Sequence, residues 1–420
     1  MTDESTSAKR SDSDEHATDV HEAAPGSVDK GVVDRPEPDQ KPEPPAATWL
    51  PDAITTFASI VLALLVGAVL IALSDEAAVE SLGYVFSYPQ DFFYFAGQAI
   101  WDSYSSLVSG SVGSIDAIGI TLVRAAPLIC AGLGVTLAFR AGLFNIGAQG
   151  QLVVGALFAG YVGFTWDLPP GLHLVAAILA GMIGGALWGA TAGFLKARTG
   201  AHEVITTIML NYLATRFLLI YLLSKDAFQR PGSDNAQSPR PADSARFPEI
   251  GNVHLGVLVA IAAAIVVWWL IERSTFGFEL RAVGANADAA RTAGMSPARV
   301  YTMAMLLAGL LAGLAATMNV LGKGDSLSPG VAGSIGFDAI TVALLGRATP
   351  LGTVLAGLLF GALSVGGTAM QASAGTPKEL GDVLQALIVL FVAAPALVRG
   401  IIRLRAQGGG ATVMAKGWGS

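Results

Sequence analysis

The amino-acid sequence predicts an all-α integral membrane protein with about ten transmembrane helices. Two observations carry this prediction. Hydrophobic residues make up 53% of the 420 positions and charged residues only 14%, whereas soluble domains are about one-quarter charged. The chain also contains ten apolar runs, and most of them have the roughly 20 residues that a helix needs to cross the hydrocarbon core of a bilayer.

The N-terminal segment is acidic and polar. Residues 1–48 hold 12 Asp or Glu and 5 Lys or Arg, which accounts for the whole net charge of −7. Such a segment cannot bury enough apolar surface to offset the entropy lost on ordering. We therefore expect a disordered acidic cytoplasmic tail over 1–52, a transmembrane domain over 53–400 and a cytoplasmic C-terminal tail over 401–420.

The expected spans follow the apolar runs in chain order, and the eighth is short. They are 55–73, 117–139, 145–164, 172–194, 203–223, 253–271, 300–321, 335–346, 351–372 and 381–398. Between them, the aromatic-rich segment 74–115 predicts a helix at the membrane surface, with an eleventh, partly inserted span as the alternative. Four prolines and several polar residues in 225–250 predict an exposed loop.

Basic residues set the expected orientation. With the N-terminus inside, the inner segments after the acidic tail carry 12 Lys or Arg and the outer loops carry 6. Since cytoplasmic loops are enriched in Lys and Arg, we expect a multi-pass membrane protein with both termini in the cytoplasm.

Four glycines recur at every fourth position of the fourth span, namely Gly181, Gly185, Gly189 and Gly193. Because four residues are just over one helical turn, they form a groove that another backbone can approach closely. The groove could join two copies of the chain or two helices within it. We favour contact within the chain.

Uncharged polar residues occur at the start of two spans. Asn145, Gln149 and Gln151 open the third span, and Thr206 and Asn211 lie in the fifth. Amides in an apolar helix are costly unless they are hydrogen-bonded, so they should face the bundle interior or a wet pathway. Hydrogen bonding between helices is the alternative role. Arg216, further along the fifth span, could reach the membrane surface or pair with an acid.

The largest inner loop, about 272–299, contains a short helix with recognisable ends. Asn286 is a good N-cap, Asp288 lies in the first turn, Gly294 ends the helix and Pro297 starts the next element. Its small Ala side chains suit docking into a cleft on a partner. A plain connector is the competing interpretation.

The chain has no sequence motif for ATP binding or catalysis. It lacks Gly-x-x-x-x-Gly-Lys-Ser/Thr, His-Glu-x-x-His, Cys-x-x-Cys and Gly-x-Ser-x-Gly. We therefore expect no catalytic activity in this chain, no cofactor and no metal site. A secondary transporter driven by an ion gradient would need carboxylates deep in its spans. The nearest candidates, Asp116 and Asp338, are expected towards the outer boundary, where Arg124 could pair with one of them.

These motifs resemble the permease subunits of ABC importers, in the branch that serves branched-chain amino acids, simple sugars and nucleosides. The stretch 143–151 is similar to the branch's NIGxEGQ-type signature, and 279–294 is similar to its coupling-helix region. Residues 200–211 look most like the guanosine-type nucleoside permeases. The resemblance covers about 55–400, and the acidic tail departs from it.

The resemblance implies that residues 53–400 form a type II-like permease bundle of the bacterial cell membrane that imports nucleosides, with simple sugars or branched-chain amino acids as alternatives. Its partners would be cytoplasmic ABC ATPase subunits, a second permease chain (the same or related), an extracytoplasmic substrate-binding lipoprotein and membrane lipid, with no nucleic acid. The implied pathway candidates are Asn145, Gln149, Gln151, Thr206 and Asn211. The implied ATPase-coupling residues are Glu279, Arg281, Gly284, Asn286, Asp288, Ala289, Ala290 and Gly294.

Overall fold

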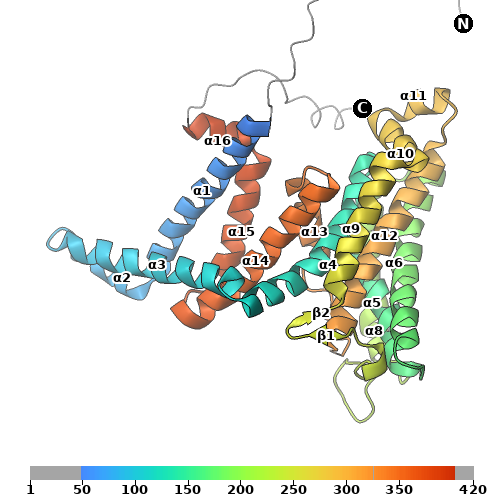
Figure 1. The fold of residues 1–420 in the computed structure, drawn as a ribbon, viewed down its shortest axis with the longest axis horizontal. Coiled ribbons are helices and arrows are strands. Elements are labelled where there is room, and N and C mark those ends of the chain that lie inside the picture. Colours follow the sequence, from blue (N-terminus) through green and yellow to red (C-terminus); the bar gives the residue numbers. More distant parts are fainter. Residues whose placement is uncertain (1–48, 325, 403–420) are drawn as a thin grey trace, which may run out of the picture. The chain divides into compact units, whose positions relative to one another are not determined.

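A computed structural model describes residues 49–324 and 326–402, and these ranges are almost entirely helical. The predicted tails, 1–52 and 401–420, lie almost wholly outside the described residues. The regular elements, labelled in part in Figure 1, are α1 (Trp49–Ser74), α2 (Glu76–Leu82), α3 (Pro89–Val112), α4 (Ile115–Arg140), α5 (Ala148–Thr165), α6 (Leu172–Thr199), α7 (Glu203–Tyr212), the π-helix η1 (Leu213–Leu219), α8 (Ile220–Leu223), the 3₁₀ turn η2 (Asp243–Ala245), β1 (Glu249–Ile250), β2 (Val253–His254), α9 (Gly256–Arg273), α10 (Thr275–Ala285), α11 (Ala287–Thr292), α12 (Pro297–Lys323), α13 (Ile335–Leu345), α14 (Pro350–Ala374), α15 (Lys378–Ala393) and α16 (Pro395–Ile402).

Helices occupy all ten segments that the sequence predicts as spans. Seven stretches within the described residues are long and apolar enough to cross a membrane, and α13 forms a shorter apolar helix. The third predicted span forms α5, whose first turn carries two glutamines and is therefore less apolar. The chain is thus a multi-pass all-α membrane protein.

The tenth predicted span, 381–398, is not continuous. Helix α15 ends at Ala393, Ala394 is not helical (φ −115°, ψ 65°), and α16 begins at Pro395. A proline cannot donate a backbone hydrogen bond, and its ring disfavours the helical conformation of the preceding residue. The helix therefore breaks one residue before Pro395.

Two ends of the bundle can be distinguished. Helices α10 and α11 lie at one end, which we call the α11 end, and the antiparallel hairpin β1–β2 lies at the other, which we call the hairpin end (Figure 1). In the hairpin, Glu249 pairs with His254 and Ile250 with Val253.

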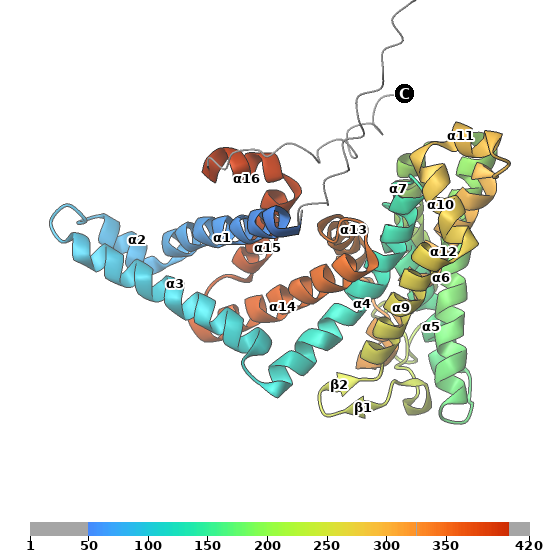
Figure 2. The ribbon, with the colours of Figure 1, turned by 45° about the horizontal axis from the view of Figure 1, so that its top comes forward.

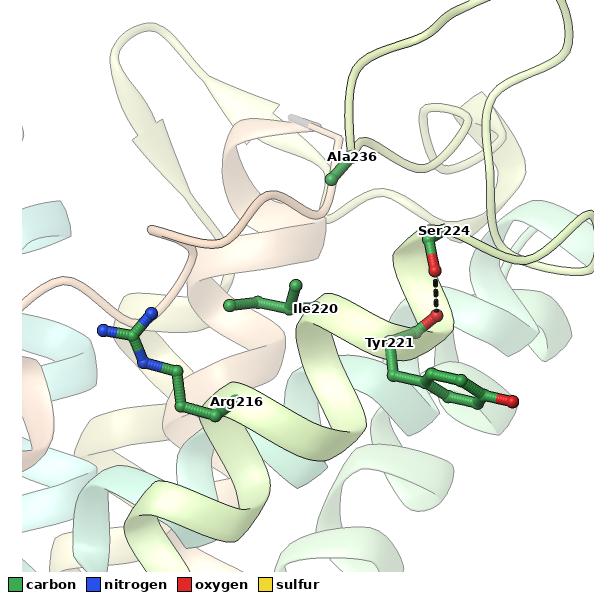
Figure 3. A pocket seen from close by; sticks show the side chains of 5 residues that line it. All are labelled: Arg216, Ile220, Tyr221, Ser224 and Ala236. Carbon is green, nitrogen blue, oxygen red and sulfur yellow. Dashed lines mark hydrogen bonds between the residues drawn. The ribbon is translucent and has the colours of Figure 1, made fainter.

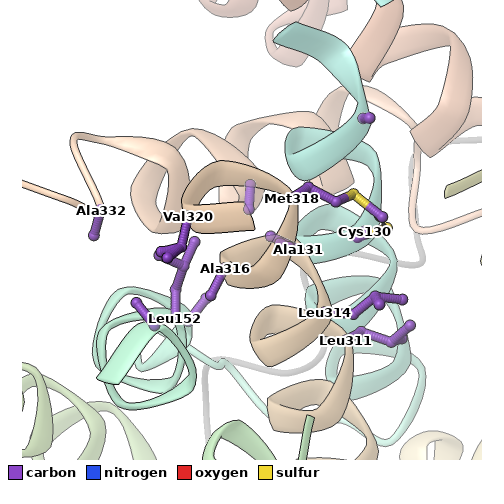
Figure 4. Packing of buried hydrophobic residues seen from close by; sticks show 14 of the residues in the cluster. Cys130, Ala131, Leu152, Leu311, Leu314, Ala316, Met318, Val320 and Ala332 are labelled. Atoms are coloured by element: carbon purple, nitrogen blue, oxygen red, sulfur yellow. Dashed lines mark hydrogen bonds between the residues drawn. The ribbon is translucent and has the colours of Figure 1, made fainter. Parts of the chain in front are cut away.

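The core of the bundle is formed where α6 and α12 pack at backbone distance. A Cβ atom added to Gly185 would lie 2.8 Å from the backbone nitrogen of Gly313, and one added to Gly189 would lie 3.1 Å from the Cα of Gly309. The glycine groove of α6 is therefore filled by α12 of the same chain, which confirms the intrachain prediction. Next to this contact between α6 and α12, Met318 and Val320 of α12 lie among buried residues of α4 and α5, including Cys130 and Leu152 (Figure 4).

The aromatic-rich segment forms α2 and α3. Helix α3 contacts α1 and the residues just after α14: the hydroxyl of Tyr104 donates to the carbonyl of Leu64 at 2.5 Å, and Ser103 bonds Thr376 at 2.7 Å. Its opposite side leaves Phe93 and Trp101 more than two-thirds exposed, and Figure 2 shows α3 leading from α2 towards the start of α4. Helix α3 is not among the spanning candidates, and its position at the membrane surface stays a prediction.

The predicted exposed loop 225–250 is instead partly buried against the hairpin end of the bundle. Ser238 and Phe247 are almost fully buried. The backbone N–H of Ser238 donates to the carbonyl of Leu327, and that of Phe247 donates to the carbonyl of Leu321. The polar composition suggested solvent exposure, but these backbone bonds attach the segment to the last turn of α12 and the residues after it.

Candidate substrate pathway and coupling helix

Two of the predicted pathway residues, Asn145 and Gln151, bind each other. The amide nitrogen of Asn145 donates to Oε1 of Gln151 at 3.2 Å, and the amide nitrogen of Gln151 donates back to Oδ1 of Asn145 at 3.3 Å. Oδ1 of Asn145 also accepts from the backbone N–H of Gly147. Both side chains are about 1% exposed. The pair fixes the turn between α4 and α5 and satisfies two buried amides.

Asn211 of α7 binds the same turn from the other side. Its Oδ1 accepts from the backbone N–H of Gly150 at 2.8 Å, and its Nδ2 donates to the carbonyl of Ile146 at 2.9 Å. The N–H groups of a helix's first turn have no partner within the helix. Asn211 therefore holds the start of α5 through both ends of one amide.

Gln149 connects α5 to the start of α13. Its Nε2 donates to the carbonyl of Gly333 at 2.7 Å, and its Oε1 accepts from the backbone N–H of Gly336 at 2.9 Å. One amide thus binds the two sides of a helix N-terminus. Asn211, the Asn145–Gln151 pair and Gln149 form a continuous series of contacts from α7 through α5 to α13, which we call the amide belt.

Thr206 does not join the amide belt. Its hydroxyl donates only to the carbonyl of His202, one turn earlier. Its neighbour Thr207 is buried instead, and a Cβ added to Gly147 would lie 3.0 Å from the Cβ of Thr207. The sequence did not distinguish the two threonines, because which of them faces α5 depends on the rotation of α7.

Helix α13 starts inside the bundle and ends near the α11 end. After α12, the chain folds back so that Val331 accepts a hydrogen bond from Asn319. Within α13, Ala339 packs against Gly132 in the second half of α4. At the far end, Nε of Arg140 donates to the carbonyl of Ala348 at 2.7 Å. Arg347 and Ala348 adopt positive φ angles of 53° and 49°, which are unusual without glycine.

Asp338 lies in the first turn of α13, where it accepts a bond from Ser334 at 2.7 Å. Its position towards the outer boundary of the membrane stays a prediction. The other candidate carboxylate, Asp116, accepts from Asn252 beside the hairpin. Arg124 donates to Ser364 at 3.2 Å.

The predicted coupling helix is α11, and its ends are formed as expected. Oδ1 of Asn286 accepts from the backbone N–H groups of Asp288 and Ala289, each at 3.0 Å. Gly294 has a φ of +85°, a conformation that side chains other than Gly and Asn rarely adopt. Asp288 and Arg291 form an exposed ion pair at 3.0 Å. Both caps are local features, so the sequence alone predicted them.

The structure divides the predicted coupling residues into an outward and an inward set. Asp288, Ala289 and Gly294 are exposed, whereas Ala290 is 4% exposed and packs beside Leu280 and Val300. Glu279 is half-buried on α10, and Arg281 of α10 lies 3.9 Å from Glu272.

Helix α10 was not predicted as a separate element, although its signal was present. Ser274 caps its start through the N–H of Gly277, a pattern that favours a helix N-terminus. A Cβ added to Gly284 would lie 3.1 Å from the carbonyl carbon of Ala141. Helix α10 thus connects α11 to the last residues of α4.

A surface pocket of about 420 Å³ lies beside η1 and α8, towards the hairpin end. It is lined by Arg216, Ile220, Tyr221, Ser224 and Ala236 (Figure 3). Arg216 is exposed, and no hydrogen bond or ion pair joins its guanidinium group to any part of the chain that the structure describes.

Comparison with known proteins identifies the family. Residues 117–393 match the model of the family described as branched-chain amino acid transport system / permease component. The guanosine ABC transporter permease protein NupP of Bacillus subtilis is 40% identical over 74% of this chain and 91% of its own length. The glucose ABC transporter permease protein TsgB13 of Haloferax volcanii is 37% identical over 68% and 82%.

A third relative has similar coverage. The nucleoside ABC transporter permease protein NupB of Lactococcus lactis is 34% identical over 71% of this chain and 85% of its own length. In each of these three organisms a second permease, whose name carries the same substrate, matches at 26–27% identity. No solved structure matches the chain. The family match covers most of the described helices, so the chain is a membrane permease that belongs to the branched-chain amino acid transport system permease family.

Proposed function

We propose that this chain is the transmembrane subunit of an ATP-driven importer of nucleosides. The observation that carries the proposal is the similarity to NupP and NupB, at 40% and 34% identity, across more than two-thirds of the chain. Both are named as permeases of ABC transporters, one for guanosine and one for nucleosides.

In this proposal α11 is the contact for a cytoplasmic ATPase subunit, so the α11 end faces the cytoplasm of a bacterial cell. Two features support it. The helix is capped at both ends and exposes Asp288 and Ala289, so it is a rigid surface for a partner. Its inner side is anchored by Ala290 and, through α10, by Gly284 against the end of α4. A displacement of α11 would therefore be transmitted to α4.

The amide belt is the proposed link between that movement and the pathway. Arg140, at the end of α4, binds Ala348 after α13, and the start of α13 is held by Gln149. A helix that begins inside a membrane bundle places its unpaired N–H groups and positive dipole end near the transport path. Asn145, Gln151 and Asn211 are proposed to position this start rather than to bind the solute directly, because their amides already bind protein groups. Among the predicted pathway residues, Thr206 alone makes no side-chain bond outside its own helical segment, because its hydroxyl binds the carbonyl of His202 at the start of α7.

The second permease of the assembly is proposed to be a related chain rather than a copy of this one. Three organisms each contain one permease at 34–40% identity and a second at 26–27% with the same substrate in its name. A diverged pair of that kind is what a heterodimeric pathway requires. An extracytoplasmic lipoprotein is proposed to deliver the solute at the hairpin end.

Glucose is the second candidate substrate, because TsgB13 is 37% identical to this chain. The deciding experiment compares uptake of radiolabelled guanosine, uridine and glucose by cells with and without the gene. Proton and sodium gradients are collapsed while ATP is maintained. We expect gene-dependent nucleoside uptake to continue.

Each other result rejects part of the proposal. Uptake of glucose alone would assign the chain to sugar transport. Uptake that stops when the gradients collapse would identify a secondary transporter. As a coupling control, Ala289→Glu on the exposed side of α11 should abolish uptake, whereas Ala298→Glu, at an exposed position in the first turn of α12, should not.

A further inference from the structure

The helix α7–η1–α8 has two different sides. The side towards α5 buries Thr207 and Asn211. The other side is exposed along its whole length, from Ile205 to Tyr221. The exposed positions on this side are Ile205, Met209, Tyr212, Leu213, Arg216 and Tyr221. Arg216 is the only charged residue in that set.

Arg216 lies within a stretch that is long and apolar enough to span a membrane. The apolar stretch Glu203–Leu223 is a spanning candidate, and Arg216 lies seven residues before its end, which corresponds to about 10 Å along a helix. A charged side chain that faces lipid at that depth is costly, so such residues usually face a water-filled cavity or a partner and mark a functional site.

The backbone is also irregular at this position. Residues Leu213–Leu219 form a π-helix, and the N–H of Ile220 donates to the carbonyl of Thr215, five residues earlier. The π-helix is rare in proteins, and the π-turns that do occur are often found at functional sites. Here the π-helix contains Arg216 and is followed directly by three other residues of the pocket: Ile220 and Tyr221 of α8, and Ser224 just after it.

The pocket beside Arg216 is an open surface depression with a mixed apolar and polar lining. Its volume of about 420 Å³ falls in the range of roughly 300–1,000 Å³ that is usual for ligand pockets. In Figure 3, Arg216 extends to one side of the helix, the Tyr221 ring turns to the other, and Ile220 lies between them below Ala236. The hydroxyl of Ser224 donates to the carbonyl of Tyr221 at 2.7 Å, which leaves the Ser224 oxygen free to accept a bond.

We propose that this pocket is a recognition site for the purine base of the transported nucleoside, with Arg216 as its specificity-determining residue. The inference rests on the proposed function and extends it to one site. A guanidinium presents parallel N–H donors that match two acceptors on one edge of a base, and O6 and N7 of guanine form such a pair. The apolar surfaces of Ile220 and Ala236 suit the face of the ring, and the Ser224 oxygen suits a ribose hydroxyl.

The chemistry predicts a ranking of substrates. Guanosine and inosine both carry O6 and N7 and should be preferred. Adenosine replaces the O6 acceptor with an amino donor, 7-deazaguanosine lacks the N7 acceptor, and uridine offers no adjacent acceptor pair. Loss of this bidentate contact should reduce the preference for guanosine and inosine over the other nucleosides by about tenfold.

The test measures uptake and its KM for guanosine, inosine, 7-deazaguanosine and uridine in cells that carry wild type, Arg216→Gln or Arg216→Lys. The matched control is Arg230→Gln, which removes an exposed cation from the segment that follows α8. Membrane protein levels are compared for all variants. We expect Arg216→Gln to raise the KM for guanosine and inosine about tenfold, to leave uridine unchanged and to abolish the preference over 7-deazaguanosine.

Two outcomes overturn the inference while wild-type nucleoside uptake continues. An equal loss for all substrates, rescued by Arg216→Lys, would assign Arg216 to an ion pair with the second permease. Unchanged uptake of every substrate would mean that the Arg216 side chain reaches the lipid headgroups. If wild type imports no nucleoside at all, the proposed function itself fails, so the two failures are distinguishable.

Discussion

Oε1 of Gln149 accepts a hydrogen bond at 2.9 Å from the backbone N–H of Gly336, 187 positions later in the chain. The amide nitrogen of the same side chain donates to the carbonyl of Gly333. A single glutamine in the first turn of α5 therefore holds the start of α13. Since α13 ends beside Arg140, at the α11 end of the bundle, this contact is one of the links between the proposed coupling helix and the centre of the bundle.

Gln149→Leu should destabilise the chain and reduce transport. Leucine has a similar length but leaves the N–H of Gly336 without its partner, at an expected cost of about 1–3 kcal/mol. Thermal unfolding of the detergent-purified protein and guanosine uptake would measure both effects. Gln229→Leu is the matched control, because Gln229 makes only a local bond to Ser233. Equal effects of the two substitutions would contradict a special role for Gln149.

Asn211→Leu should be more harmful than Thr206→Ala, although both residues are polar and lie on α7. Asn211 is 7% exposed and satisfies two backbone groups of the α4–α5 turn, so its loss should cost about 1–3 kcal/mol. Thr206 bonds only its own helix, so its loss should stay within about 0.5 kcal/mol. The melting temperatures of the two variants test the order, and the reverse order would refute the contacts assigned to Asn211.

Gly185→Val should prevent normal packing of α6 on α12. Its Cβ would lie 2.8 Å from the backbone nitrogen of Gly313, where no flexible side chain can move away. Overpacking of this kind typically costs about 1–3 kcal/mol. Gly97→Val on α3 is the control, since a Cβ at Gly97 meets nothing within 4 Å. Protein level in the membrane and thermal stability should fall for the first variant only.

Gly294→Val should abolish ATP-driven uptake while the protein remains inserted in the membrane. Valine is strained at a φ of +85°, whereas asparagine tolerates the left-handed region. Gly294→Asn should therefore retain most uptake. Asn286→Pro should act like Gly294→Val, because the φ of Asn286 is −161° and proline fixes φ near −65°. Normal uptake in both disruptive variants would remove the coupling role of α11.

The sequence by itself determined the features that depend on neighbouring residues. Apolar runs of about 20 residues placed the spans, since length and hydropathy are local properties. Asn286 and Gly294 marked the ends of α11, because a cap acts within one helical turn. The glycine spacing of α6 indicated a surface for close backbone approach. The break before Pro395 is a local effect of the same kind, although the apolar run 381–398 predicts one continuous tenth span.

Only the tertiary structure decided what these elements contact. Nothing near Gln149 in the sequence identifies Gly336 as its partner, and nothing near Ala290 shows that it faces inward while Ala289 faces outward. The path of the chain after α12 brought the start of α13 against Gln149, and backbone bonds to α12 and the residues after it buried part of a polar loop. The physical reason is that helix rotation and long-range pairing are set by packing across the whole bundle. The residues within one helical turn contain no information about that packing.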